Sequence, residues 1–219
     1  MLQARATAIS RKKRRTQEER SATARANLIA AAIQLICENG FARTTTADIA
    51  RVAGLTRGAI QHHFEGRVDL VTTILLDVEK RVLDSFTAAA PRLGLPLEQR
   101  IDILIDGLGA VTRSPTYLAA MDIWFTSRSD PDLREVVVQS MRRYVDHFRE
   151  LWRTTFCDEV PEAAISDSRR VVVAVSRGLI FSRLISPDRM DRSITLTLKT
   201  TKDLIKGHML AARDRKKGR

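Results

Sequence analysis

The run Thr46-Ala47-Asp48-Ile49-Ala50-Arg51-Val52-Ala53-Gly54-Leu55-Thr56-Arg57-Gly58-Ala59-Ile60-Gln61 has the pattern of two short helices joined by a tight turn. Ala50 is small enough for two helices to cross there, and Gly54 can adopt the positive φ of a sharp turn. Thr56 can cap the second helix and leave its first turn free to enter a DNA major groove. Four apolar side chains would face inward: Ile49, Ala53, Leu55 and Ile60. We therefore predict a helix-turn-helix at about residues 44–64, although a plain corner between two helices shares part of the pattern.

The rest of the chain also has helical periodicity, and no segment alternates as a strand does. Thr16 and Glu19 have the spacing of a helix capping box, so we expect ordered structure to begin there. Further helices are expected at about residues 24–38, 46–53, 56–63, 68–86, 97–111, 115–126, 132–156, 163–185 and 191–212. The predicted fold class is all-α, with about nine helices.

Positive charge is concentrated at the two ends of the 219-residue chain. Residues 1–67 carry 12 Lys or Arg and 5 Asp or Glu, a net charge of +7, whereas residues 68–210 carry 20 of each kind. Residues 211–219 add five basic residues and one acidic residue. A basic end beside a neutral body suits a polyanionic partner such as DNA, although a solvated basic tail has the same composition.

The motifs of common enzymes are missing from the sequence, so we expect no catalysis and no cofactor. It contains no P-loop, no GxGxxG, no GxSxG and no HExxH, and its four histidines do not have zinc-finger spacing. Cys37 and Cys157 form no CxxC pair, and we interpret both as buried small residues in a reducing compartment. With no long apolar run and no signal peptide, we expect a cytoplasmic protein without a membrane partner or a metal.

A longer set of residues around the predicted helix-turn-helix resembles the N-terminal signature of the tetracycline-repressor (TetR) family of transcriptional regulators. The resemblance covers residues 25–75 and is carried by Gly40-Phe41, Thr44-Thr45-Thr46, Ile49-Ala50, Ala53-Gly54, Gly58-Ala59-Ile60, His63-Phe64 and Leu70. It implies an Ω-shaped homodimer of nine-helix subunits. Helices one to three would bind DNA, and the remaining helices would form a ligand-responsive core that also dimerises.

The resemblance also implies which residues touch DNA, because helix three of such proteins lies in the major groove. The residues expected to face bases are Arg57, Gly58, Gln61 and His62. The residues expected to contact phosphates are Thr45, Thr56, His63 and Arg67. Gln61 stands where a phosphate-contacting tyrosine is common, and Glu65 adds a negative charge near the DNA. Arg57 could read guanine and Gln61 adenine, or each could be a phosphate contact or a solvated side chain.

Aromatic residues gather in two stretches of the C-terminal half, where a regulator would need a ligand site. The candidate ligand-binding residues are Met121, Trp124, Phe125, Phe148 and Trp152. On facing helices they could line an apolar pocket, but ordinary core packing would produce the same pattern. A stripe that includes small residues, Val171, Val175, Gly178, Leu179 and Ser182, could pair two subunits or pack within one.

These observations divide the chain into four parts: a disordered basic tail (1–15), a helix-turn-helix domain (16–67), a helical ligand-binding and dimerisation domain (68–212) and a second basic tail (213–219). The predicted function is sequence-specific DNA binding, most simply as a repressor released from a palindromic operator by a small apolar or amphipathic effector. The alternative is a non-specific DNA-binding protein, or a helical protein-interaction module, without a ligand response.

Overall fold

A computed structural model describes residues 16–88, 94–185 and 190–218. These residues form nine α-helices and two short 3-10 helices and contain no strand, which confirms the predicted fold class. The elements are α1 (Gln17–Asn39), η1 (Phe41–Arg43), α2 (Thr46–Val52), α3 (Arg57–His63), α4 (Arg67–Ala88), α5 (Leu97–Arg113), α6 (Pro115–Thr126), η2 (Ser127–Ser129), α7 (Pro131–Phe156), α8 (Glu162–Ile185) and α9 (Met190–Lys217).

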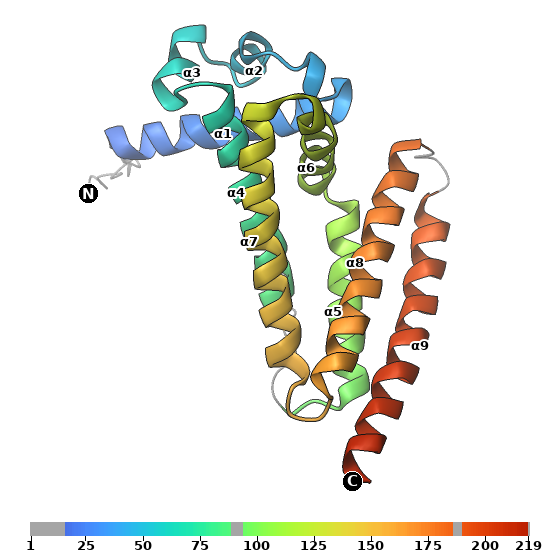
Figure 1. Ribbon diagram of the computed structural model, residues 1–219. Helices are drawn as coiled ribbons and strands as arrows, with labels where there is room; N and C mark the ends of the chain where they lie inside the picture. Colours follow the sequence, from blue (N-terminus) through green and yellow to red (C-terminus); the bar gives the residue numbers. More distant parts are fainter. Residues whose placement is uncertain (1–15, 89–93, 186–189, 219) are drawn as a thin grey trace, which may run out of the picture.

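The first three helices form a separate layer at one end of the molecule, which we call the head (Figure 1). Helix α1 runs across the adjacent ends of α4 and α6, and the short helices α2 and α3 lie on its outer side. The capping box predicted at Thr16 is present, because its hydroxyl accepts from Glu19 N–H at 3.2 Å and Glu19 Oε2 accepts from Thr16 N–H at 2.8 Å. The local sequence therefore defines the start of the head.

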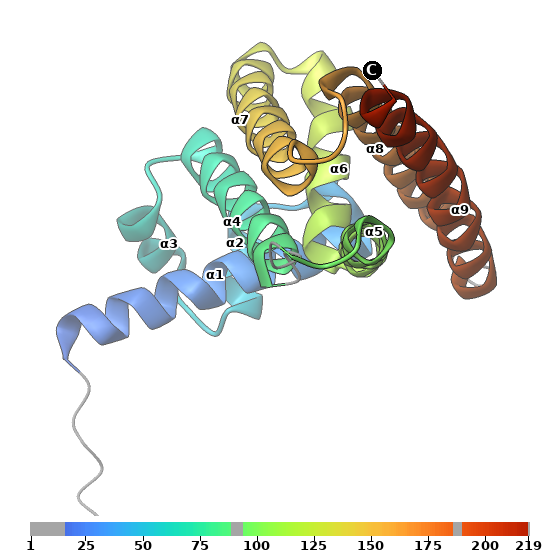
Figure 2. The same cartoon turned by 90° about the horizontal axis from the view of Figure 1, so that it is seen from below.

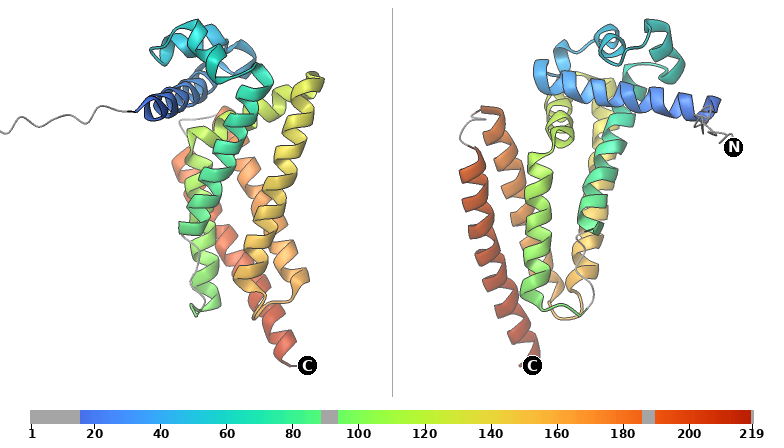
Figure 3. Two further views of the ribbon diagram at one scale, coloured as in Figure 1. Left: turned by 90° about the vertical axis from the view of Figure 1, so that its left-hand side faces the viewer. Right: turned by 180° about the vertical axis from the view of Figure 1, so that it is seen from behind.

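Helices α4 to α9 form the body, in which long helices run away from the head (Figure 1). Helices α4 and α7 lie side by side, and α5 packs against α4, α8 and α9. Seen along the bundle, α8 and α9 form the outermost layer, on the side opposite α3 (Figure 2). The right-hand view in Figure 3 shows the same pair at the edge of the molecule, with α5 beside it. One side of the α8–α9 pair is therefore free of other described elements.

Helix ends in the body fall where the sequence has proline or a capping residue. Pro115 and Pro131 occupy the first turns of α6 and α7, where a missing N–H removes no helical hydrogen bond. Asp130 caps α7 by accepting from Leu133 N–H at 3.2 Å. The starts of α6 and α7 agree with the predicted breaks to within one residue.

A single cluster of buried apolar side chains extends from the head into the body. Leu28 of α1 and Ile74 of α4 are both fully buried in it, as is Met209 of α9. Burial of this kind contributes roughly 25 cal/mol for each Å² of apolar surface removed from water. The head is thus continuous with the body core through α1 and α4.

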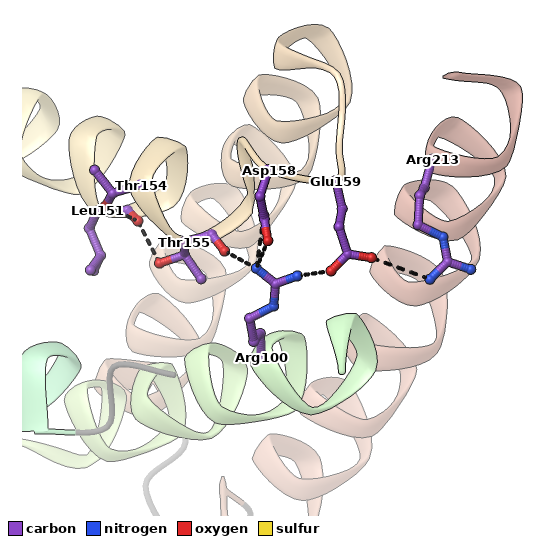
Figure 4. A network of polar contacts seen from close by, with 7 residues as sticks. All are labelled: Arg100, Leu151, Thr154, Thr155, Asp158, Glu159 and Arg213. Atoms are coloured by element: carbon purple, nitrogen blue, oxygen red, sulfur yellow. Dashed lines mark hydrogen bonds and ion pairs between the residues drawn. The ribbon is translucent and has the colours of Figure 1, made fainter. Parts of the chain in front are cut away.

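At the end of the body that is farthest from the head, a buried arginine connects several helices (Figure 4). Arg100 of α5 is only 1% exposed, and its Nη1 donates to Thr155 O at 2.6 Å and to Asp158 Oδ1 at 2.9 Å. Its Nη2 pairs with Glu159, whose other oxygen lies 3.7 Å from Arg213 Nη1 of α9. One guanidinium therefore links α5 to the α7–α8 connection and, through Glu159, to α9.

A second polar contact joins α4 to α7. Glu79 of α4 is buried, and its carboxylate accepts from His147 Nδ1 at 2.8 Å and lies 3.5 Å from Arg143 Nε. Because both partners are on α7, the acid links the helix that leads out of the head to its neighbour in the body.

Several expectations need correction. Cys157 is exposed rather than buried, because it follows the last residue of α7, and Cys37 is only half-buried. Helix α9 continues to Lys217, so no separate tail begins at residue 213. The disordered tail predicted at residues 1–15 lies outside the described residues. Within the described ranges, no helix is both long and apolar enough to cross a membrane.

Candidate DNA-binding site

The turn between α2 and α3 has the geometry that the sequence predicts. Gly54 has φ +68°, and a Cβ built on it meets no atom within 4 Å, so the backbone conformation alone favours glycine. Leu55 N–H donates to Ala50 O at 2.9 Å and closes the turn. Ala50 is itself 2% exposed, which agrees with its predicted place at the helix crossing. The turn thereby holds α3 at a fixed angle to α2.

Helix α3 buries one face and exposes the other. Ile60 is buried in the core, and Phe64, directly after the helix, is buried as well. Four of the predicted DNA contacts are exposed on the outer face: Arg57, Gly58, Gln61 and His62. His63 is half-buried, with its ring 5.6 Å from that of His62. The exposed face carries the donors and acceptors that direct base recognition requires.

Threonines cap both helices of the motif. Thr56 Oγ1 accepts from Ala59 N–H at 3.2 Å, and Thr45 Oγ1 accepts from Asp48 N–H at the same distance. The Thr45 hydroxyl also donates to Asp48 Oδ2 at 2.6 Å. This hydrogen bond, and a second one from Arg51, lower the pKa of Asp48. Thr45 and Thr56 are both exposed, so each can cap its helix and still face a phosphate.

Arg67 has two partners that the sequence did not indicate. Its guanidinium carbon lies 4.5 Å from the centre of the Phe41 ring, and Nη1 lies 3.7 Å from Asp130 Oδ2. Half of the side chain is still exposed at the first residue of α4. Arg67 therefore lies between the head and the start of α7, and a DNA phosphate would compete with Asp130 for it.

Further contacts fix the head on the body, and none of them was foreseen. Asp122 of α6 accepts a short hydrogen bond from Phe41 N–H. Arg25 of α1 donates to Thr73 Oγ1 of α4 at 3.0 Å. Cys37 Sγ donates to Pro115 O at 3.3 Å. A displacement of α4 or α6 would therefore change the position of the head.

The five candidate ligand residues do not share one environment. Phe148 and Trp152 are fully buried in a row of rings along α7, with centroids 6.0 Å apart. Met121 is buried, Trp124 lines a surface hollow beside Met141, and Phe125 is 47% exposed. Phe148 and Trp152 are thus packed as core residues are.

A small cavity of about 40 Å³ lies between α4, α5 and α6. Val78 and Tyr117 are among the residues that line it. Tyr117 and Tyr144 are both buried, and burial raises the pKa of each hydroxyl above its usual value. The cavity has room for about one water molecule.

Several large apolar side chains are exposed on α8 and α9, beside charged ones such as Arg177 and Lys199, and they match the stripe considered from the sequence only in part. Leu179 points into the core, whereas Val171 and Gly178 are exposed as a shared face would require. The large exposed apolar side chains of the two helices are Val171, Phe181, Ile185, Leu196 and Leu204. Because apolar residues occupy consecutive positions in α8, as at Val171, Val172 and Val173, its sequence alone does not fix which side faces out.

Comparisons with known proteins agree with this geometry. Residues 28–74 match the family model described as "Bacterial regulatory proteins, tetR family". Residues 95–203 match a second one, "Tetracyclin repressor-like, C-terminal domain". The transcriptional regulator CymR of Pseudomonas putida is 28% identical over 140 residues, which cover 64% of this chain and 68% of CymR.

Two solved structures, GusR and EbrR, have the same fold. Salmonella enterica GusR superposes with a TM-score of 0.66 at 20% identity, covering 89% of this chain and 97% of GusR. The multidrug binding protein EbrR, complexed with imidazole, has a TM-score of 0.57 at 20% identity, covering 84% of this chain and 89% of EbrR. At these identities the structural likeness establishes the fold alone.

Proposed function

The chain belongs to the TetR family of transcriptional regulators, and on that premise we propose that it represses transcription by binding a palindromic operator and leaves it when a small molecule binds. The observation that carries the proposal is the exposed face of α3, where Arg57, Gly58 and Gln61 lie on a helix fixed by a capped, glycine-containing turn. The net charge of +7 on residues 1–67 adds a non-specific attraction to phosphates.

Base reading is assigned to two residues of α3. Arg57 has the donor pair that matches O6 and N7 of guanine, and Gln61 can pair with N6 and N7 of adenine. Thr45, Thr56, His63 and Arg67 surround this face and would hold the phosphates that set its register. His62 is exposed on the same helix and would lie in the groove or at its edge.

Two copies of the chain would pair through the exposed apolar stripe of α8 and α9. Phe181, Ile185 and Leu196 are each more than half exposed, and joining two such stripes would form a four-helix interface. A two-fold pair would place two copies of α3 in successive major grooves about 34 Å apart. The operator is therefore expected to be a palindrome.

Release by a small molecule would act through the contacts between head and body. Phe41 is held by Asp122 of α6, and Arg67 by Asp130 at the start of α7. A molecule that binds better to a shifted position of α6 or α4 would move the two heads away from the groove spacing, and DNA affinity would fall. EbrR, a protein of this fold, is described as a multidrug binding protein and is complexed with imidazole, which supports small-molecule binding by a protein of this fold.

The test is selection of DNA from a random library by the full-length protein at two salt concentrations. A palindromic consensus is expected at low salt. A plot of the logarithm of the affinity against the logarithm of the salt concentration should have a slope of about −5 if about six phosphates are contacted. Recovery of no consensus would contradict sequence-specific regulation and favour a non-specific binder or an interaction module.

The Arg57→Ala variant tests the assignment of bases within that experiment. The variant should lose about 1–3 kcal/mol of discrimination between bases at one position of each half-site, so that the consensus becomes degenerate at that position. Arg149→Ala removes the same charge from an exposed site on α7 and should leave the consensus unchanged. An equal weakening on every sequence would identify Arg57 as a phosphate contact.

A further inference from the structure

A surface hollow lies on the outer side of the body, between the end of α6, η2 and the first half of α7. Two adjoining depressions of about 490 and 460 Å³ share Arg128, Arg134 and Val138, and we treat them as one site, the α6–α7 hollow. The hollow is open to solvent, and it lies outside the bundle core that contains Phe148 and Trp152.

Three arginines line the hollow, and none of them forms an ion pair with an acid of the described residues: Arg128, Arg134 and Arg142. Glu135 also lines the hollow, and its hydrogen bond from the neutral amide of Gln139 at 3.3 Å leaves its charge in place, so the lining carries three positive charges and one negative charge. The hollow is therefore electropositive.

The other arginines of α7 behave differently. Arg143 pairs with Glu79, Arg149 with Asp146 at 3.1 Å, and Arg153 with Glu150 at 2.6 Å. The lack of an acidic partner is thus a property of the face of α7 that lines the hollow, and not of exposed arginines on this helix in general.

The arginines surround an apolar floor. Val138 is 39% exposed, and Met141 and Trp124 lie beside it in the same depression. A small anion such as phosphate or chloride would pair with the guanidinium groups but would leave the apolar floor in contact with water. A neutral apolar molecule would leave the three guanidinium groups without a partner.

From these two properties we propose that the α6–α7 hollow binds an amphiphilic oxyanion, a molecule with an apolar chain or ring and a carboxylate or phosphate group. The guanidinium groups would form charged, bidentate hydrogen bonds with the oxyanion, and Val138, Met141 and Trp124 would cover the apolar part. Helix α7 runs away from the head, so Arg142 lies farther from the DNA-binding face than Arg134, which favours a small ligand over DNA (Figure 1). The proposal concerns binding and does not depend on the proposed operator.

The experiment titrates the full-length protein by calorimetry with decanoate below its micelle concentration. Decan-1-ol supplies the apolar chain without the charge, and inorganic phosphate supplies the oxyanion without the chain. We expect decanoate to bind at least about tenfold more tightly than either, since charge-assisted hydrogen bonds and apolar burial each add affinity.

The double variant Arg134→Gln, Arg142→Gln locates the site. It should weaken decanoate binding by at least about tenfold, whereas Arg149→Gln with Arg153→Gln, the same charge change on the same helix, should leave it unchanged. Unchanged decanoate affinity in the first double variant would overturn the proposal by placing the ligand elsewhere. Absence of decanoate binding, or phosphate binding as tight as that of decanoate, would overturn it as well.

Discussion

The head and the body are stabilised in different ways. In the head, the interactions that define the helix-turn-helix domain span six residues or fewer: the caps at Thr16, Thr45 and Thr56 and the turn at Gly54. In the body, the polar contacts join residues far apart in sequence, such as Arg100 and Asp158 or Glu79 and His147. Precise placement of α3 therefore depends on local backbone geometry, and cohesion of the body on long-range burial.

Replacing Arg100 with alanine should have the largest effect on stability. It removes a fully buried side chain and leaves Thr155 O without its donor, while Asp158 and Glu159 can regain water because both are partly exposed. We expect a loss of about 2–4 kcal/mol in the free energy of unfolding, measured with urea.

Arg149→Ala is the matched control, because it breaks an exposed ion pair on α7 and should cost less than about 1 kcal/mol. The folded fraction of Arg100→Ala should keep its operator affinity. A stability loss as small as that of the control would show that the buried network does not hold the body together.

Replacing Gly54 with valine should lower the free energy of unfolding less than Arg100→Ala does. It should weaken DNA binding more. Valine at φ +68° is strained by about 1–3 kcal/mol, with no steric clash because the space around the Cβ is open. The tilt of α3 should change, and operator affinity should fall by more than about tenfold. Gly54→Asn should retain more affinity, because asparagine tolerates this backbone region. If the unchanged protein, Gly54→Val and Gly54→Asn bound the operator equally well, the conformation of the turn would not matter for DNA binding.

The smallest effect on stability is expected from protonation of Asp158 at low pH. Burial tends to raise the pKa of Asp158, but the hydrogen bond and charge of Arg100 outweigh it and lower the pKa below the ordinary 3.8. The stabilisation is therefore present above pH 3.8 and is lost as pH falls through the lower, folded-state value. Since Asp158 is half exposed, we expect only about 0.2–1 kcal/mol.

Urea unfolding between neutral pH and strong acid measures this effect. Asp158→Asn should lower stability at neutral pH and reduce the loss in acid, whereas Asp146→Asn, at an exposed pair on α7, should change neither. If Asp158→Asn lost as much stability in acid as the unchanged protein does, Arg100 would not favour the ionised form of Asp158.

The same contrast explains what the sequence revealed. The capping box at Thr16 and the caps at Thr45 and Thr56 need residues only three positions apart, so their spacing is visible in the chain. Gly54 was predicted to take positive φ for the same reason, and it does. Helix starts and ends in the body followed from Pro115, Pro131 and other local breaks.

Long-range contacts could not be predicted in this way. Arg100 has the same chemical type as the exposed arginines, and its burial depends on acids about 60 positions away, as Figure 4 shows. Asp122 and Asp130 gave no signal that they would hold Phe41 and Arg67. In α8, Leu179 belonged to a stripe that could pair two subunits or pack within one; it points inward, because neighbouring positions are also apolar and only packing fixes the rotation of the helix.

The exposed apolar stripe on α8 and α9 has a consequence for the level of the protein in a cell. If two chains must join there before either reads DNA, the concentration of the active form rises with the square of the chain concentration when most chains are single. Halving synthesis would then leave about a quarter of the active pairs. Phe181 and Leu196, although far from α3 in sequence, would thereby make operator occupancy a steep function of gene dosage.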